Sequence, residues 1–173
     1  YKDHSIEVED FGRGIPVDYN AKEDRFNWEL VFCELYAGGK YQNNTGENYE
    51  FSLGLNGLGT CATQYASEYM EAEVHSGGFC YELQFKAGKI NGEMKKTPYD
   101  KKDTGTRIKW RPDLKVFTDI AIPLEYFQEI LKRQSVVNPG IKFILKNQLT
   151  ETKFETFEYV YDNGIVDYVN EFV

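Results

Sequence analysis

Residues 9–18 read EDFGRGIPVD and place a carboxylate, two glycines and a proline directly behind an alternating run of residues. The alternation of Ile6 and Val8 with polar neighbours predicts a β-strand that ends near Asp10. An ordinary turn needs one glycine or one proline, whereas Gly12 and Gly14 together indicate a backbone that another group approaches closely. The plainer alternative is that the Asp10 side chain only caps an Asx-type turn.

A second glycine cluster, GLNGLG over residues 54–59, precedes a predicted helix. Backbone N–H groups at the start of a helix can bind phosphate oxygens, although such glycines also serve as a simple helix start. The chain has no G-x-x-x-x-G-K-[ST] motif and no strand followed by a Rossmann fingerprint, which excludes an ordinary P-loop and a Rossmann dinucleotide site. A nucleotide site would therefore be of another kind.

Composition limits the function classes further. The chain has 173 residues, a length typical of one domain, and a net charge of −8 that argues against binding to a nucleic-acid backbone. Its three cysteines have no C-x-x-C spacing and its two histidines, His4 and His75, lie far apart in sequence, so neither a zinc site nor a disulfide framework is expected. Without a signal peptide or a long apolar run, the chain is expected to be cytoplasmic and not membrane-bound.

Periodicity predicts several helices. A first helix is expected between a cap at Asp24 and a stop at Gly38-Gly39, and a second over residues 60–70. Residues 122–136 predict a third, with Leu124, Phe127 and Ile130 on one face, and a short helix follows Asn163-Gly164.

Strands are expected where the pattern changes to period two, at residues 69–76, 78–88, 106–112, 141–147 and 153–161, joined in part by Lys- and Pro-containing turns. Helices and strands are segregated along the chain, which predicts an α+β protein with a mostly antiparallel sheet. No linker or repeat divides it, so residues 1–173 are expected to form a single domain.

Four motifs, taken in order, resemble the ATPase domain of the B subunits of bacterial type II topoisomerases, DNA gyrase and topoisomerase IV. EDFGRGIPVD is similar to the family's D-[ND]-G-R-G-I-P, LYAGGKY to H-A-G-G-K-F, FSLGLNGLG to S-G-G-L-H-G-V-G, and TGTRIKWRPD to T-G-T-x-V-x-F-x-P-D. The resemblance covers residues 5–173. It implies a Bergerat-type fold, a two-layer sandwich whose mixed, mostly antiparallel sheet packs on helices.

The resemblance also implies how an adenine base is held. Asp10 corresponds to the carboxylate that accepts the exocyclic amino proton, a role that suits an acceptor-only group. Gly14 lets the ring lie against backbone, Ile15 and Pro16 form an apolar wall, and Thr106 helps to hold the base.

The phosphate end of the nucleotide is implied in the same way. Tyr49 corresponds to a tyrosine on the far edge of the ring and Lys40 to a lysine facing the phosphates, although Lys40 could instead be a favourable charge at a helix C-terminus. The lid amides that would bind phosphate oxygens belong to Leu55, Asn56, Gly57, Leu58 and Gly59.

For the complete enzyme the family implies ATP and Mg²⁺ as cofactors, the topoisomerase A subunit and DNA as partners, and ATP-driven DNA strand passage as the activity. The domain alone is expected to be a monomer that takes ATP or an ATP-site inhibitor. Two alternatives are a nucleotide-binding or inhibitor-binding module without turnover and another member of the same ATPase superfamily.

Some positions depart from the family pattern. Phe11, Leu53 and Asn56 replace the usual motif residues, and Ser76 lies where the family has an arginine that coumarin-type inhibitors stack on. The family's E-x-x-x-N helix, which supplies the general base and the Mg²⁺ ligand, precedes the first strand and is expected upstream of Tyr1. The chain does contain Glu23 and Asn27 at this spacing, which could share a helical face, but their order in the chain predicts solvated surface rather than catalysis.

Overall fold

The computed structural model describes residues 1–41 and 57–172, and these residues form two compact units. The larger unit spans Ser5–Ile120, and the smaller unit combines Tyr1–His4 with Ala121–Val173. The expectation that residues 1–173 form a single domain stays a prediction.

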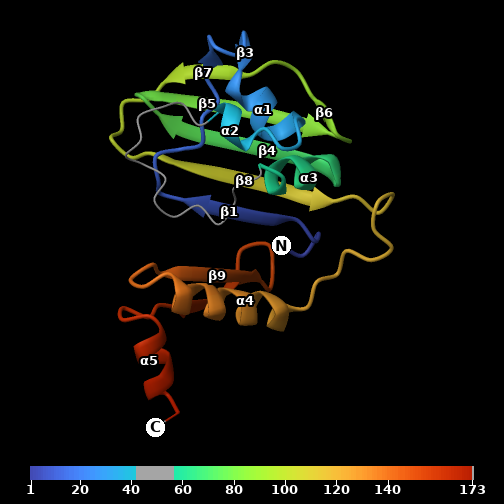
Figure 1. The fold of residues 1–173 in the computed structure, drawn as a ribbon. Helices are drawn as coiled ribbons and strands as arrows, with labels where there is room; N and C mark the ends of the chain where they lie inside the picture. Colours follow the sequence, from blue (N-terminus) through green and yellow to red (C-terminus); the bar gives the residue numbers. More distant parts are fainter. Residues whose placement is uncertain (42–56, 173) are drawn as a thin grey trace. The chain divides into compact units, whose positions relative to one another are not determined.

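The larger unit is built on one antiparallel sheet (Figure 1). Its strands follow the order β1-β8-β4-β5-β6, and β7 also pairs with β5. The strands are β1 (Ile6–Asp10), β4 (Ser67–Ser76), β5 (Phe79–Lys86), β6 (Lys89–Ile90), β7 (Lys95–Pro98) and β8 (Gly105–Pro112). All pairings between described strands are antiparallel, and the predicted α+β class is confirmed.

Three short helices lie on one side of this sheet (Figure 1): α1 (Asn27–Cys33), α2 (Gly38–Tyr41) and α3 (Gly59–Tyr65). Because side chains alternate along a strand, every second residue of β4 faces these helices. Met70, Ala72 and Val74 are buried in this way and share one core with Phe32 of α1. The opposite face carries the intervening polar residues of β4.

The first helix differs from its prediction. Residues 19–26 form a hairpin of β2 (Tyr19–Asn20) and β3 (Arg25–Phe26), and Asp24 lies in its turn with a positive φ of 50°. Its carboxylate accepts a hydrogen bond from the Tyr19 hydroxyl, so the predicted helix cap at Asp24 is wrong. The helix ends before Glu34, and Gly38 begins α2 instead of stopping α1. Local cross-strand bonding of the hairpin outweighs the helical spacing of the apolar residues.

The helix predicted over residues 60–70 is also shorter than expected, because α3 ends at Tyr65 and β4 begins at Ser67. The Ser67 hydroxyl donates to the Thr63 carbonyl oxygen at 2.5 Å, and from Met70 onward alternate side chains enter the core. The structure also has two strands, β6 and β7, where the sequence pattern predicts turns. Both are short and exposed edge segments rich in lysine, and edge strands of that composition carry little periodic signal.

The smaller unit contains α4 (Leu124–Val137), β9 (Phe143–Gln148), β10 (Phe154–Tyr159) and α5 (Ile165–Asn170). The two strands pair only with each other, as an antiparallel hairpin. These elements lie where the sequence predicts them. None of the helices in residues 1–41 and 57–172 has both the length and the apolar character needed to cross a bilayer.

Candidate functional site

The antiparallel pairing of β1 with β8 brings Asp10 directly opposite Thr106. Residues opposite each other in such a pair project to the same face of the sheet, so these two side chains belong together. Thr106 is only 5% exposed, whereas Asp10 is open to solvent. Two residues that are far apart in sequence therefore meet at one edge of the sheet, and their role in recognising a base stays a prediction.

The Asp10 carboxylate is held by the loop that follows it. Its Oδ1 accepts a hydrogen bond from the Gly12 backbone N–H at 2.9 Å, and a Cβ at Gly12 would lie 3.0 Å from the same oxygen. This is the geometry of an Asx-type turn. The turn occupies one oxygen, and a carboxylate has lone pairs to accept further donors, so capping the turn and accepting a ligand proton are compatible.

The loop is also fastened to β8. The Ile15 N–H donates to Thr106 Oγ1 at 3.0 Å, and the Thr104 hydroxyl donates to the Gly12 carbonyl oxygen at 2.6 Å. The buried Thr106 hydroxyl therefore positions the Ile15-Pro16 segment, and both residues of that segment are half-buried. The resemblance implies Thr106 at the site but does not reveal this backbone contact.

Two glycines of these motifs allow neighbouring backbone segments of the protein to approach each other closely. Gly14 has a φ of 81°, and a Cβ there would lie 2.9 Å from both the His75 carbonyl oxygen and the Val74 side chain. A Cβ at Gly105 would overlap the Asp10 carbonyl oxygen. The close approach inferred from the glycine spacing is present, and its partners are the ends of β4 and β1.

An apolar surface lies beside Asp10 on the same face of the sheet. Val8 pairs with Ile108, which pairs in turn with Ala72 of β4. Ala72 is 3% exposed beneath the helices, but Val8, in the same row, is 55% exposed. Within the described residues the helices thus cover the β4 end of this row and leave the β1 end open next to a carboxylate.

Lys40 lies at the end of α2 and forms an ion pair with Glu34 at 2.7 Å. The Lys40 ammonium and then the Arg25 guanidinium lower the pKa of Glu34 below its usual value. The backbone of the same lysine is also anchored, because its carbonyl oxygen accepts from the buried Asn20 amide at 3.1 Å. The predicted phosphate-facing role of Lys40 stays a prediction.

The Glu23–Asn27 spacing does not form a pair on a helical face. Glu23 lies in the turn between β2 and β3, whereas Asn27 begins α1 and is fully buried. The Asn27 amide donates to Asp18 at 3.1 Å and accepts from Asn20 at 2.9 Å. Its donor and acceptor atoms are thus used to hold the hairpin against α1. The possibility of a shared helical face is wrong because the local chain is a hairpin.

The glycine cluster is only partly described. Leu58 is the N-cap of α3 without a side-chain cap, Gly57 has a φ of 63°, and a Cβ at Gly59 would meet no atom within 4 Å. Tyr49, Leu55 and Asn56 lie outside the described residues. The prediction that the lid amides bind phosphate therefore stays a prediction for Gly57, Leu58 and Gly59.

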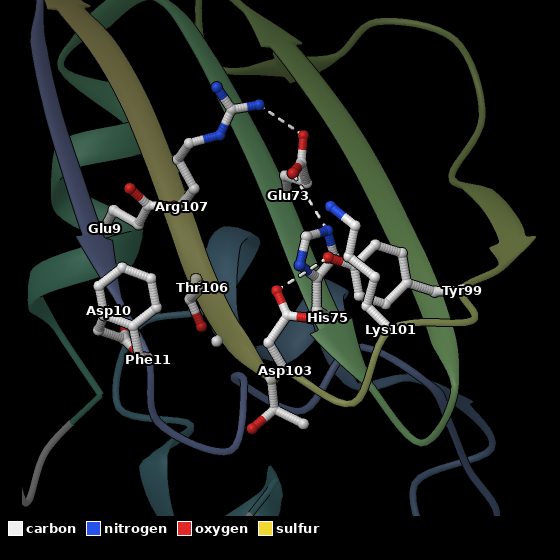
Figure 2. Close-up of a pocket in the computed structure, with 12 residues that line it drawn as sticks. Glu9, Asp10, Phe11, Glu73, His75, Tyr99, Lys101, Asp103, Thr106 and Arg107 are labelled. Carbon is white, nitrogen blue, oxygen red and sulfur yellow. Dashed lines mark hydrogen bonds and ion pairs between the residues drawn. The ribbon is translucent and has the colours of Figure 1, made fainter.

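A surface hollow of about 220 Å³ lies at the ends of β1, β4 and β8 (Figure 2). Asp10, Phe11 and Thr106 form one side of it, and Glu73, His75 and Tyr99 the other. Gly14, Ile15, Pro16 and Lys40 are not among its lining residues. Glu73 and His75 project to the face of the sheet opposite to the side chains of Asp10 and Thr106, so the hollow reaches these two residues at the strand ends and is not the predicted base site itself.

Comparison with models of protein families found no match for this chain. The chain is similar to the B subunit of DNA gyrase from Thermotoga maritima, with 34% identity over 98% of this chain and 26% of that protein. It is also similar to the B subunit of DNA topoisomerase 4 from Escherichia coli, with 33% identity over 100% of this chain and 27% of that protein. The chain thus spans about a quarter of the length of these relatives.

Solved structures agree with this likeness. The topoisomerase IV ATP-binding domain of Francisella tularensis, in complex with a small-molecule inhibitor, aligns with a TM-score of 0.77 and 27% identity over 99% of this chain and 44% of that chain. The 43K ATPase domain of Thermus thermophilus gyrase B, in complex with an aminocoumarin, aligns with a TM-score of 0.78 over 99% of this chain and 41% of that chain. At 20% identity the second likeness supports the fold alone. Because these similarities run through the whole chain, the chain belongs to the family of type II topoisomerase B subunits.

Proposed function

We propose that residues 1–173 bind the adenine end of ATP at the edge of the sheet formed by β1 and β8. The observation that carries this proposal is the cross-strand pair of Asp10 and Thr106 beside the open apolar row that starts at Val8. An aromatic base with an exocyclic amino group matches this surface, because it has an apolar face for Val8 and a donor for the carboxylate.

Each residue of the site has a separate part in binding. The Asp10 carboxylate accepts the amino proton through lone pairs that the Gly12 N–H does not use. Thr106 accepts the Ile15 N–H and so holds Ile15 and Pro16 as a wall for the base. Gly57, Leu58 and Gly59 supply backbone N–H groups for phosphate oxygens, and Lys40 supplies a positive charge when it exchanges Glu34 for a phosphate.

The described residues do not provide a site that fits Mg²⁺ at this place. The only E-x-x-x-N spacing of the chain ends in Asn27, whose amide is fully buried and hydrogen-bonded to Asp18 and Asn20. We therefore infer that residues 1–173 bind ATP-site ligands without turning ATP over. This inference favours the alternative that residues 1–173, on their own, are a nucleotide-binding or inhibitor-binding module without turnover.

For the whole protein we propose the activity of its family, ATP-driven DNA strand passage in the cytoplasm together with the topoisomerase A subunit, with Mg²⁺ held by residues outside 1–173. The net charge of −8 supports a division of labour in which other parts of the protein contact DNA. The domain alone is proposed to be monomeric.

Calorimetry with a non-hydrolysable ATP analogue and a steady-state ATPase assay test both parts of the proposal. We expect measurable binding that Asp10→Asn weakens, and turnover no faster than in a protein-free control. Glu23→Gln, a substitution in the β2–β3 turn, serves as the matched variant for catalysis. Turnover that Glu23→Gln abolishes would identify Glu23 as the base and contradict the proposal of binding without hydrolysis.

A further inference from the structure

Three side chains of different ligand types meet on the hairpin of β4 and β5. Glu73 and His75 come from β4 and Cys80 from β5, and one carboxylate oxygen, one imidazole nitrogen and the thiol sulfur all lie within 4.8 Å of one another. The register explains the meeting, since His75 pairs directly with Cys80 and Glu73 lies two residues before His75 on the same face. All three residues are half-buried.

The cluster lies on the face of the sheet away from the core. Val74, between Glu73 and His75, is fully buried in the core, so its two neighbours project to the other side. There Glu73 and His75 line the hollow shown in Figure 2. A ligand at this cluster has access from solvent without disturbing the packed helices.

The surroundings hold the side chains in place. His75 stacks on Tyr99 with the ring centroids 3.9 Å apart, and Tyr99 is itself fixed by its hydrogen bond to Asp103 at 3.0 Å. Glu73 bonds to Arg107 through one oxygen and approaches His75 Nε2 at 3.1 Å with the other (Figure 2). Partners of this kind orient metal ligands.

The turn that joins the two strands is equally restrained. Gly77 and Gly78 have φ values of 60° and 79°, as a two-residue type I′ hairpin turn requires. The Gly78 carbonyl oxygen accepts the Tyr99 N–H at 2.9 Å, so the turn is tied to the segment that carries the stacking ring. The three ligand residues therefore lie on a restrained hairpin, which keeps their ligand atoms close together.

We propose that Glu73, His75 and Cys80 form a binding site for a divalent transition metal of the zinc class. One sulfur, one nitrogen and one oxygen ligand match the preferences of Zn²⁺ and Co²⁺, and three protein ligands leave a fourth, tetrahedral position open to water. A thiol and an imidazole do not suit Mg²⁺, so this site is distinct from any Mg²⁺ bound with a nucleotide. The cysteine and histidine spacing in the sequence did not indicate it, because the ligands come together only across two strands.

Titration of the full chain with Co²⁺ in the absence of nucleotide tests the proposal. We expect one Co²⁺ per chain, a thiolate-to-metal charge-transfer band in the near ultraviolet, and visible bands of tetrahedral Co²⁺ that Zn²⁺ removes. Cys80→Ser should abolish the charge-transfer band, and His75→Gln should weaken binding at least about tenfold. Cys33→Ser and His4→Gln are the matched controls and should leave the titration unchanged.

Circular dichroism of each variant separates loss of a ligand from loss of the fold. If Cys80→Ser does not fold, Glu73→Gln replaces it as the second variant and should weaken Co²⁺ binding in a folded chain. The proposal is overturned if wild-type protein shows no thiolate band. It is also overturned if the band survives in folded Cys80→Ser or disappears in Cys33→Ser.

Discussion

Asp10→Asn separates the two tasks of the Asp10 side chain. In the structure Oδ1 accepts the Gly12 N–H at 2.9 Å, and an asparagine Oδ1 can accept the same bond. The turn is therefore retained, and we expect the free energy of unfolding to change by less than about 0.5 kcal/mol, as for a surface substitution. The charge and the acceptor-only character of the group are lost.

The expected effect on ligand binding follows from that loss. A hydrogen bond to a charged group contributes about 1.5–3 kcal/mol. At about 1.4 kcal/mol per factor of ten, the affinity for an ATP analogue should fall by about 10- to 150-fold. Asp10→Ala should lose this affinity and also about 0.5–1.5 kcal/mol of stability, because Gly12 N–H loses its partner.

Calorimetry gives the affinities and urea denaturation gives the stabilities of the same three proteins. Unchanged affinity in Asp10→Asn would refute the reasoning, because the carboxylate would then have no part in recognising the base. Equal loss of stability in both variants would show that the turn requires the charge and not the acceptor.

Three further predictions concern the framework of the site and are all measured by urea denaturation. Thr106→Val keeps the shape of a buried side chain but removes the acceptor of the Ile15 N–H, and should lower the free energy of unfolding by about 1–3 kcal/mol. Thr106→Ser keeps the hydroxyl and should lower it by less. Equal losses in the two variants would contradict a role for the hydroxyl. Gly14→Ala adds a Cβ at a φ of 81° with neighbours at 2.9 Å and should lower the free energy of unfolding by about 2–5 kcal/mol. Gly92 has a similar φ of 87° but no atom within 4 Å of such a Cβ, so Gly92→Ala should lower it by only about 1–2 kcal/mol. Similar losses in both variants would contradict the close approach at Gly14. Burial raises the pKa of the Cys33 thiol to about 11, so its contribution to stability is present below the unfolded pKa near 9 and is lost as the pH rises towards 11. Between about pH 8.5 and 10.5 the wild type should therefore lose about 1.5–2 kcal/mol more of its free energy of unfolding than Cys33→Ala. Parallel pH curves for the two proteins would contradict the raised pKa.

Much of this protein follows from local sequence patterns. Period-two alternation located β4, β5 and β8, and the helical spacing of Leu124, Phe127 and Ile130 located α4. Asp10 and Thr106 were named as site residues through the resemblance of their motifs to the topoisomerase family, and the structure pairs them across two strands. The strands and the helix were predictable because each depends on the types and spacing of residues within one short segment.

Local patterns failed where long-range contacts decide the conformation. The apolar spacing after Asp24 suggested a longer helix, but the buried amides of Asn20 and Asn27 stabilise a hairpin there. The same hairpin separates Glu23 from Asn27, whose spacing alone resembles a catalytic pair.

The tertiary structure alone decided what surrounds each site residue. The bond from Ile15 to Thr106, the packing of Gly14 against the end of β4, and the meeting of Glu73, His75 and Cys80 all depend on strand register. Register is set by which face of each strand the core buries, and this depends on the whole sheet rather than on any one segment. The residue types of the site are therefore determined by the sequence, and their contacts by the packing of the sheet.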